Sequence, residues 1–465
     1  MATSSNKVFI LLPDGIGLRN FIYTDFLTYN KAVVWTPLDY LDASIEQLRL
    51  PDYRSHKMTD IYKTALVKAQ LFAHYKAFGD PAYLDYISLS KSKTLKGKLK
   101  ATLIDWFAKK YADTKRLEQL QEKYIKSIKK SDYYLQCRAQ LEGEQPSFVF
   151  CTNQRMITAA APMLAAQELG IPTGTFIFSW DNMPKGNLSV PADHYFVWSE
   201  YMKKEFHKYY PDIDRDRVHV VGTPQFIPYT NERLYESRED FCAHYNLNPS
   251  AKIICFSGDD VTTSPHDPLY LRDTAEAVRR MNELGGGKYQ ILFRRCPVDV
   301  SERYNGILEK YDDVIFSAPP LWKKPKGSEA WHGIVPTPED IKLLVNTVLH
   351  CDTAVNVGST IAHDFACMGK TSCYFKYNPV DKGAWDIHKI YRYIHFRSMQ
   401  GLDPIYWIES SEDIDKMIIA ATKDSEKKIL DAKQWLRTIV THPLSDANGR
   451  IWKTINNITK VKPCT

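Results

Sequence analysis

Two segments of the same design, one in each half of the chain, constrain the fold more than any other feature. Residues 7–20 (KVFILLPDGIGLRN) and residues 353–370 (TAVNVGSTIAHDFACMGK) each contain an apolar run, a glycine-containing turn and an amphipathic pattern. This order is typical of a strand that leads into a helix N-terminus, where unpaired N–H groups and the helix dipole attract anions. One copy in each half predicts two open α/β sheets that face each other across a cleft.

Strand-sized apolar runs alternate with helical patterns along most of the 465 residues, which favours βαβ units and parallel sheets. A helix is expected at 20–27, and buried strands at 8–12, 32–35, 147–151, 174–179, 195–198, 218–221, 253–256, 289–293, 314–316, 353–357 and 372–375. Residues from about 55 to 142 show helical periodicity and are predicted to form an insertion in the first domain. The expected domains are residues 1–228, with this insertion, and residues 229–440, followed by a helical tail at 441–465 that can return to the first domain.

The composition is that of an ordinary globular enzyme. Hydrophobic residues make up 44% of the chain and charged residues 25%. No apolar run approaches the ~20 residues that cross a bilayer, and residues 1–7 lack the basic-then-apolar order of a signal peptide. Nine scattered cysteines without a Cys-x-x-Cys pair favour free thiols in a reducing compartment. We therefore expect a cytoplasmic protein.

Positive charge is concentrated in one stretch of the predicted insertion. Residues 91–130 contain 13 Lys/Arg and four Asp/Glu, a net charge of +9, whereas the whole chain carries +6. The stretch can be the solvated face of long helices, or it can bind an anionic membrane surface or lipid-linked acceptor at the inner membrane face. No nucleic-acid-binding module is visible, so nucleic acid is not an expected partner.

The strongest local site in the second half is Gly358-Ser359-Thr360. Gly358 allows a ligand to approach the backbone, and the two hydroxyl residues can bind phosphate at the helix start. Asp364 lies one turn further on and can accept from ribose hydroxyls. The alternative is simple helix capping by Ser359 or Thr360.

Two further turns of the second half follow predicted strands. Arg295, at the end of the strand 289–293, is placed for bidentate pairing with phosphate oxygens, and Arg294 is expected on the opposite face. Gly258, in the turn Ser257-Gly-Asp-Asp260, can approach a diphosphate or sugar. The alternatives are a surface salt bridge for Arg295 and an ordinary acidic turn for 257–260.

Three polar turns in the first half follow three predicted parallel strands and therefore share one sheet edge, where ligands bind in open α/β sheets. Asp14 or Asp181 is a candidate general base for an acceptor hydroxyl. Each turn can equally be ordinary loop structure. The candidate substrate-binding residues of these turns are Gly15, Gly17, Arg19, Asn153, Arg155, Trp180 and Asn182.

The sequence favours a metal-independent mechanism. No His/Cys spacing resembles a zinc site, and neither a Gly-x-Ser-x-Gly elbow nor a Walker loop is present. Asp212-Ile-Asp214 matches an Asp-x-Asp motif in letters but lies between a predicted helix and strand, where it is expected to be a turn. His363 is expected to be structural.

The chain resembles bacterial glycosyltransferases of the two-Rossmann (GT-B) fold that build surface polysaccharides and lipopolysaccharides. The likeness is carried by Ser179-Trp-Asp-Asn182, by Gly358-Ser-Thr360 and by the opening LPDGIGLRNF at 12–21. It implies that the donor diphosphate contacts Ser359 and Thr360, that Asp364 binds the ribose, and that no cofactor is needed beyond a nucleotide-sugar, with UDP-sugar the expected donor. The chain departs from the pattern at Arg295-Cys-Pro297, which lacks a His, and at Thr371, where Pro is usual.

The expected function is therefore transfer of a sugar from a nucleotide donor to a polysaccharide, lipopolysaccharide or lipid-linked acceptor. Three alternatives remain open: a nucleotide-sugar epimerase, a polyol-phosphate transferase of the same fold, and a non-catalytic scaffold that binds glycan or membrane.

Overall fold

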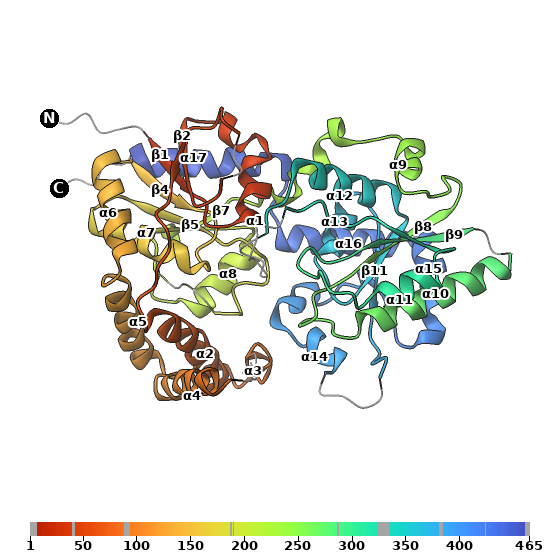
Figure 1. The fold of residues 1–465 in the computed structure, drawn as a ribbon, viewed down its shortest axis with the longest axis horizontal. Coiled ribbons are helices and arrows are strands. Elements are labelled where there is room, and N and C mark those ends of the chain that lie inside the picture. Colours follow the sequence, from red (N-terminus) through yellow and green to blue (C-terminus); the bar gives the residue numbers. More distant parts are fainter. Residues whose placement is uncertain are drawn as a thin grey trace. The chain divides into compact units, whose positions relative to one another are not determined.

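The computed structural model describes residues 7–39, 42–87, 94–186, 188, 190–285, 288–323, 334–380, 385–423 and 425–460. The chain divides into two compact units (Figure 1). Unit 1 consists of Met1–Pro224, Tyr393–His395 and Ile439–Thr465, and unit 2 of Gln225–Arg392 and Phe396–Thr438. The division after Pro224 lies close to the boundary expected at residue 228, and the last helix of the chain belongs to unit 1.

Unit 1 is built on a parallel sheet with the order β3-β2-β1-β4-β5-β6-β7 in the described residues. In register, Val8 of β1 lies between Ala32 of β2 and Phe148 of β4. The central strands are buried and apolar because helices cover both faces of a parallel sheet. The strands are β1 (Val8–Leu11), β2 (Ala32–Thr36), β3 (Gln47–Arg49), β4 (Phe148–Cys151), β5 (Thr173–Phe176), β6 (His194–Val197) and β7 (Val218–Val220).

Helices from distant parts of the sequence pack on this sheet. Trp452, on the last helix, stacks on Phe26 at 5.1 Å between ring centroids, and its Nε1 donates to the Phe26 carbonyl at 2.7 Å. Figure 1 shows this helix, in blue, beside the red and yellow strands of unit 1. The helices around the sheet are α1 (Gly15–Gly17), α6 (Asp132–Glu144), α7 (Ile157–Glu168), α8 (Glu200–Tyr209) and α17 (Ala447–Lys460).

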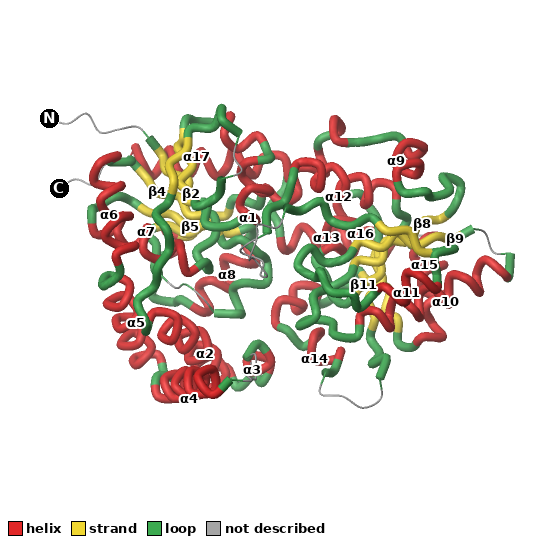
Figure 2. Tube along the Cα trace, in the orientation of Figure 1, coloured by secondary structure: helices red, strands yellow, loops and turns green. Residues whose placement is uncertain are grey.

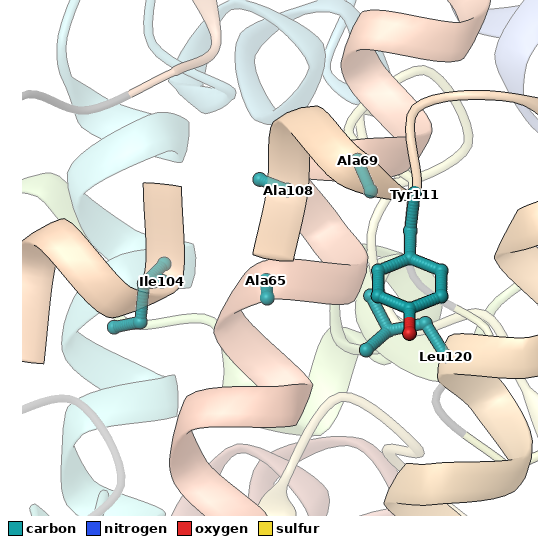
Figure 3. Packing of buried hydrophobic residues seen from close by; sticks show 6 residues of the cluster. All are labelled: Ala65, Ala69, Ile104, Ala108, Tyr111 and Leu120. Atoms are coloured by element: carbon teal, nitrogen blue, oxygen red, sulfur yellow. The ribbon is translucent and has the colours of Figure 1, made fainter. Parts of the chain in front are cut away.

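The insertion between β3 and β4 is helical, as predicted. A small core of its own, shown in Figure 3, joins Ala65, Ala69, Ile104, Ala108, Tyr111 and Leu120. Of the charge-rich stretch 91–130, residues 91–93 lie outside the described residues. The helices that precede α6 are α2 (Thr59–Phe78), α3 (Ala82–Asp85), α4 (Leu95–Lys110) and α5 (Thr114–Ile128). No helix in the described ranges combines the length and apolar character that crossing a membrane requires.

Unit 2 repeats the design with a parallel sheet of order β10-β9-β8-β11-β12-β13 in its described residues (Figure 2). Its strands are β8 (Lys252–Ser257), β9 (Tyr289–Arg294), β10 (Ile315–Ser317), β11 (Thr353–Asn356), β12 (Ser372–Phe375) and β13 (Ile405–Ile408). Its helices are α9 (Arg238–His244), α10 (Asp267–Glu283), α11 (Asn305–Lys310), α12 (Pro338–His350), α13 (Ile361–Cys367), α14 (Ile387–Tyr391), α15 (Ile414–Lys423) and α16 (Glu426–Ile439). The expected fold class, α/β with two Rossmann-like domains, is confirmed.

The helix predicted at 20–27 is wrong in detail. A π-helical turn covers Leu18–Ile22 and a 3-10 turn covers Asp25–Thr28. Two bonds explain the break: the Tyr23 N–H donates to the Leu18 carbonyl at 2.9 Å, and the Thr24 hydroxyl donates to the Asn20 carbonyl at 3.0 Å. A side chain that takes a backbone acceptor in this way competes with the helix ladder.

Candidate functional site

Both sheets reverse their strand order at one point. In unit 1 the chain builds outward from β1 to β2 and β3, then returns to the other side of β1 with β4. In unit 2 it builds from β8 to β9 and β10, then returns beside β8 with β11. Ligands of open α/β sheets bind at the carboxyl ends of the strands that flank such a reversal. Candidate residues that follow β1 and β4 in unit 1, or β8 and β11 in unit 2, therefore lie at these two points.

Asp14 and Asn153 meet at the reversal in unit 1. Asp14 follows β1 and is 1% exposed; its Oδ1 caps α1 by accepting from the Gly17 N–H at 3.2 Å. Its Oδ2 accepts from Asn153 Nδ2, which follows β4, at 2.5 Å. Gly17 has a packing role, because a Cβ there would lie 2.9 Å from Thr152 Oγ1. Gly15 is also buried in this turn.

Arg19 and Arg155 lie in the turns of the same edge. Arg19 Nε donates to its neighbour Asn20 at 3.3 Å, and the Arg155 N–H donates to Asn153 Oδ1 at 3.1 Å. Burial lowers the pKa of the Arg155 guanidinium, whereas the charge of Asp181 raises it. Asn182 is buried, and its Oδ1 has no hydrogen-bond partner among the described residues. A small pocket is lined by Gln154, Arg155, Ile177, Asn182, Met183, Leu188 and Tyr210.

Asp181 is locked by its neighbours in the turn after β5. Its carboxylate accepts from Ser179 Oγ at 2.7 Å and from Asn182 Nδ2 at 2.9 Å, and it forms an ion pair with Lys185. Burial opposes ionisation, but the charge of Lys185 and the hydrogen bonds of Lys185 and Ser179 hold the pKa of Asp181 well below its usual range.

Trp180 is also buried in this turn, with 4% of its surface exposed. Its ring packs edge-on against His395, with 4.7 Å between ring centroids. Little of the indole face is therefore open to a ligand, and the predicted stacking of Trp180 on a sugar stays a prediction.

Two titratable residues of unit 1 were missed from the sequence. Glu205 on α8 is 8% exposed, and its Oε2 has no hydrogen-bond partner in the described structure. Burial, opposed by Lys208 and aided by Asp181, raises the pKa of Glu205 to about 8. Burial lowers the pKa of His395 to about 3. A signal for Glu205 exists: it shares the buried face of α8 with Met202, Phe206 and Tyr209, at helical spacing.

In unit 2, the turns after β8 and β9 are packed tightly together. The Gly258 N–H donates to the Arg294 carbonyl at 2.8 Å. A Cβ on Gly258 would lie 3.1 Å from Tyr304 Oη and 3.3 Å from both Arg295 Cα and Asp267 Oδ2. Glycine at this position therefore lets the two turns approach, which is a structural reason for its presence next to the reversal.

The two adjacent arginines after β9 have different environments. Arg294 is 7% exposed and forms a buried ion pair with Asp340, with Nη2 at 2.8 and 2.9 Å from the two carboxylate oxygens. Arg295 is half-buried; its Nη2 donates to the Ser301 carbonyl at 2.5 Å and lies 3.8 Å from the Asp299 carboxylate. The Nε of Arg295 has no hydrogen-bond partner in the described residues. A guanidinium with an unused donor is what an anion-binding role requires.

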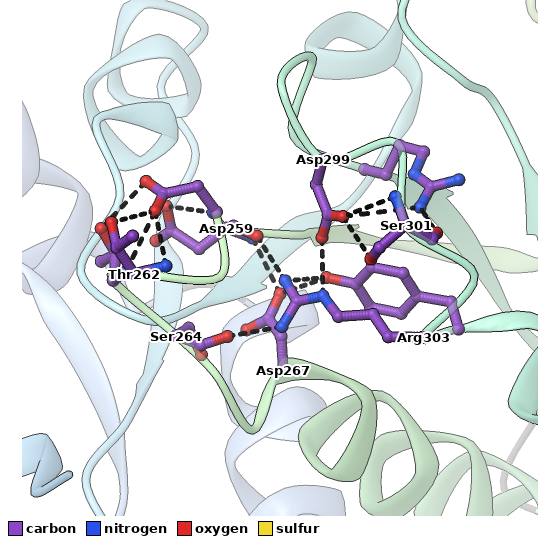
Figure 4. A network of polar contacts seen from close by, with 11 residues as sticks. Asp259, Thr262, Ser264, Asp267, Asp299, Ser301 and Arg303 are labelled. Atoms are coloured by element: carbon purple, nitrogen blue, oxygen red, sulfur yellow. Dashed lines mark hydrogen bonds and ion pairs between the residues drawn. The ribbon is translucent and has the colours of Figure 1, made fainter. Parts of the chain in front are cut away.

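A polar network fixes these turns (Figure 4). Arg303 donates to Asp299 Oδ2 and to the Asp259 carbonyl, both at 2.6 Å. Asp267 Oδ2 accepts from the Asp259 N–H at 2.8 Å and from Tyr304 Oη at 2.9 Å. Burial raises the pKa of Asp267 to about 6 and, with the nearby charges of Asp267 and Asp260, raises that of Asp259 well above its usual range. The network rigidifies the loop that carries Gly258.

Gly358, Ser359 and Thr360 follow β11, on the other side of the reversal from β8. Gly358 has φ +65°, and a Cβ there would lie 2.9 Å from the Phe396 ring. The Ser359 N–H donates to Asn356 Oδ1 at 2.7 Å, and the Ser359 carbonyl accepts from Tyr374 Oη at 2.9 Å. Thr360 occupies the N-cap position of α13 without a side-chain capping bond. Hydrogen bonds of Ser359 therefore fix the turn on both sides. Thr360 does not cap α13 with its side chain, so the alternative of simple capping is wrong for Thr360.

Asp364 and His363 lie within α13. Asp364 is 6% exposed in the first turn of the helix, and its predicted contact with ribose stays a prediction. His363 is fully buried with its ring 4.1 Å from that of Trp435, between centroids. No cluster of three His, Cys, Asp or Glu side chains suited to a metal ion occurs among the residues that the structure describes.

No family model matches the sequence, and no curated protein matches it. Solved structures do match along nearly the whole length. S. aureus MnaA in a co-structure with UDP has a TM-score of 0.53 and 11% identity, covering 98% of both chains. A glycosyltransferase from Rickettsia africae ESF-5 has a TM-score of 0.53 and 10% identity, covering 99% of this chain and 100% of that one.

A third match is the UDP-GlcNAc 2-epimerase from Methanocaldococcus jannaschii. Its TM-score is 0.52 and its identity 11%, covering 97% of this chain and 99% of that one. At these identities the likeness shows the fold alone. The chain has the two-Rossmann, GT-B-like fold that these three structures share.

Proposed function

We propose that the chain is an enzyme that acts on a UDP-sugar, with the diphosphate bound by unit 2. The observation that carries this proposal is the position of Arg295, whose buried Nε has no hydrogen-bond partner among the described residues. Arg295 follows β9, the neighbour of β8, at the same carboxyl edge of the parallel sheet as the Gly358–Thr360 turn after β11. Guanidinium N–H groups and backbone N–H groups are suited to diphosphate oxygens. The co-structure of S. aureus MnaA with UDP supports UDP as the nucleotide.

We assign glycosyl transfer to a glycan, lipopolysaccharide or lipid-linked acceptor as the reaction. Arg295, Ser359 and Thr360 stabilise the negative charge that develops on the leaving phosphate. Asp14 is the better of the two candidate bases, since the lowered pKa of Asp181 and its ion pair with Lys185 make Asp181 a weak proton acceptor. In this proposal Asp181 holds Lys185 and the Trp180–Asn182 turn in place, and the pocket beside Arg155 and Asn182 receives polar groups of the acceptor.

Epimerisation of the UDP-sugar is the second candidate, because the M. jannaschii UDP-GlcNAc 2-epimerase shares the fold over 97% of this chain. This reaction needs no acceptor. Proton NMR of UDP-GlcNAc incubated with the protein separates the two: a new anomeric signal without free UDP indicates epimerisation. UDP release that depends on an added acceptor indicates transfer.

Nucleotide binding itself is tested by thermal unfolding with UDP, GDP, dTDP, CMP and CDP. A ligand that binds only the folded state raises Tm in proportion to its affinity and concentration. We expect UDP to give the largest rise. A rise with CDP instead would favour a polyol-phosphate transferase, and no rise with any nucleotide would favour a non-catalytic scaffold and contradict the proposal.

Replacement of Arg295 with Ala, or of Thr360 with Val, should lower turnover of the UDP-sugar at least tenfold, about 1.4 kcal/mol of transition-state stabilisation. The matched control is Arg279→Ala, which removes a half-buried arginine of α10 that pairs with Asp313. Steady-state kinetics on folded variants measure the effect. Unchanged turnover in both site variants would contradict the assignment of these residues.

A further inference from the structure

Helix α4 of the insertion exposes large apolar side chains that the described residues leave uncovered. Leu95, Leu99, Leu103 and Trp106 are 76%, 64%, 37% and 51% exposed. Exposed apolar residues are ordinary when scattered, but a contiguous group on one element indicates an interaction surface. We call these four residues the α4 stripe.

The α4 stripe lies opposite the face that holds the helix in the fold. At 100° per residue, its four residues fall within an arc of about 80°. Ile104 and Ala108 project from the other side of α4 and are buried in the core that the helix shares with α2 (Figure 3). The helix therefore has two apolar faces: one is used for packing inside unit 1, and the other is left for a partner.

Lysines border the α4 stripe along both of its edges. At the same 100° per residue, Lys96 lies just outside one edge, Lys98 and Lys109 lie outside the other, and Lys110 lies within the arc at the C-terminal end of the stripe. All four are exposed, and Lys110 Nζ lies 4.7 Å from the centroid of the Trp106 ring. An apolar strip with Trp and Leu that is flanked by lysines is the pattern of a helix that lies in the interface of an anionic bilayer.

We propose that the α4 stripe docks unit 1 onto a membrane surface that contains anionic lipid. The leucines and Trp106 enter the boundary between headgroups and acyl chains, and the lysines contact lipid phosphates. Charge selects this partner over a second copy of the chain, because two lysine-bordered stripes brought face to face would repel each other. The proposal goes beyond the enzymatic function and does not depend on it.

Co-sedimentation of the full chain with vesicles tests the proposal. We expect binding to vesicles that contain 30% phosphatidylglycerol, weak binding to pure phosphatidylcholine, and a decrease as salt screens the charges. Leu99→Ser combined with Trp106→Ser should lower the partition coefficient at least tenfold, and Lys96→Glu combined with Lys98→Glu should do the same. The matched controls are Leu430→Ser, which alters a leucine of α16 that is 58% exposed, and Lys416→Glu combined with Lys453→Glu.

The depth to which Trp106 enters the bilayer is measured by quenching of its fluorescence with lipids that are brominated on their acyl chains. The difference between wild type and Trp106→Phe isolates the signal of Trp106, and we expect this signal to be quenched only with anionic vesicles. Equal binding of stripe and control variants, or an unquenched Trp106, would overturn the proposal. The proposal would also be overturned if the wild-type chain formed a concentration-dependent dimer that the stripe variants abolish and did not bind vesicles. The Tm rise with UDP should be the same in all variants, so failure here is distinguishable from failure of the proposed function.

Discussion

At the scale of the residue, adjacent positions in the sequence have opposite roles because a strand turns successive side chains to opposite faces. Arg294 and Arg295 are the clearest case. The expectation that Arg294 faces away from Arg295 follows from this alternation, whereas its partner Asp340 could not be predicted, because it lies 46 positions away on another element. Asp340 also accepts from the Leu321 N–H and the Trp322 indole N–H. The ion pair therefore connects the end of β9, residues 321–322 and the start of α12.

Replacement of Arg294 with Ala should lower the free energy of unfolding by about 3–5 kcal/mol, because it leaves the Asp340 carboxylate buried without its cation. Urea unfolding measures the change. Arg279→Ala, whose ion pair is at the surface, should change the free energy of unfolding by less than about 1 kcal/mol. Equal changes in the free energy of unfolding for the two substitutions would contradict the expectation that the buried ion pair is the more important one for stability.

Glu205 gives unit 1 a stability that depends on pH. Its pKa is raised from 4.5 to about 8, so the folded chain keeps a proton that the unfolded chain releases. The free energy of unfolding should therefore fall as pH rises from about 4.5 to about 8. Glu205→Gln removes this dependence, and urea unfolding at pH 5 and pH 8 should show a smaller difference for the variant than for wild type. An identical difference in both proteins would contradict the burial argument.

At the scale of the element, the central strands were predictable because each is a short apolar run bounded by turn residues. Two edge strands were missed. The strand Gln47–Arg49 is mostly polar, exposed and three residues long, and pairs only with β2 in the described sheet. The strand Ile405–Ile408 (IYWI) is itself a short apolar run after Pro404, so its local signal was present and was overlooked. No such signal marks the Tyr393–His395 segment, whose contacts with Tyr86 and Trp180 exist only after folding.

Gly174 in β5 shows how closely the strands of unit 1 pack. A Cβ there would lie 2.7 Å from ring atoms of both Phe148 on β4 and Phe196 on β6. Gly174→Ala should therefore lower the free energy of unfolding by about 1–3 kcal/mol through overpacking. Gly143→Ala is the control, since nothing lies within 4 Å of its added Cβ and alanine favours the helix α6. The midpoints of thermal and urea unfolding should fall for Gly174→Ala and should rise or stay unchanged for Gly143→Ala. An unchanged midpoint for Gly174→Ala would contradict the prediction.

At the scale of the whole molecule, the repeated strand–turn–helix segments were enough to predict two Rossmann-like units. They could not decide between transfer and epimerisation, because one fold hosts many reactions and the chemistry resides in side chains at the sheet edges. The sequence brought the candidate residues to those edges through strand order. It could not show that Asp14 bonds Asn153, since this contact joins the turns after β1 and β4 and depends on how they pack.

We expect helix α17 to contribute as much to the stability of unit 1 as the central strands of that unit do. Trp452 is 2% exposed and packs on Phe26, so Trp452→Ala should lower the free energy of unfolding of unit 1 by about 3–5 kcal/mol. Trp106→Ala, which truncates an exposed tryptophan, should have little effect. Circular dichroism during urea unfolding measures both. The Tm rise with UDP should persist in Trp452→Ala, because the residues assigned to the diphosphate belong to unit 2.

The contact between Phe26 and Trp452 joins residues 426 positions apart, which has a consequence for biosynthesis. A ribosome that has finished every strand of unit 1 has not yet made the helix that covers them. The apolar surface around Phe26 stays open until residues 447–460 have been translated and have left the ribosome, and a chaperone that shields nascent chains would have its binding site there. A stop codon placed shortly before residue 447 would leave every proposed catalytic residue in the product and yet yield a chain that quality-control proteases remove.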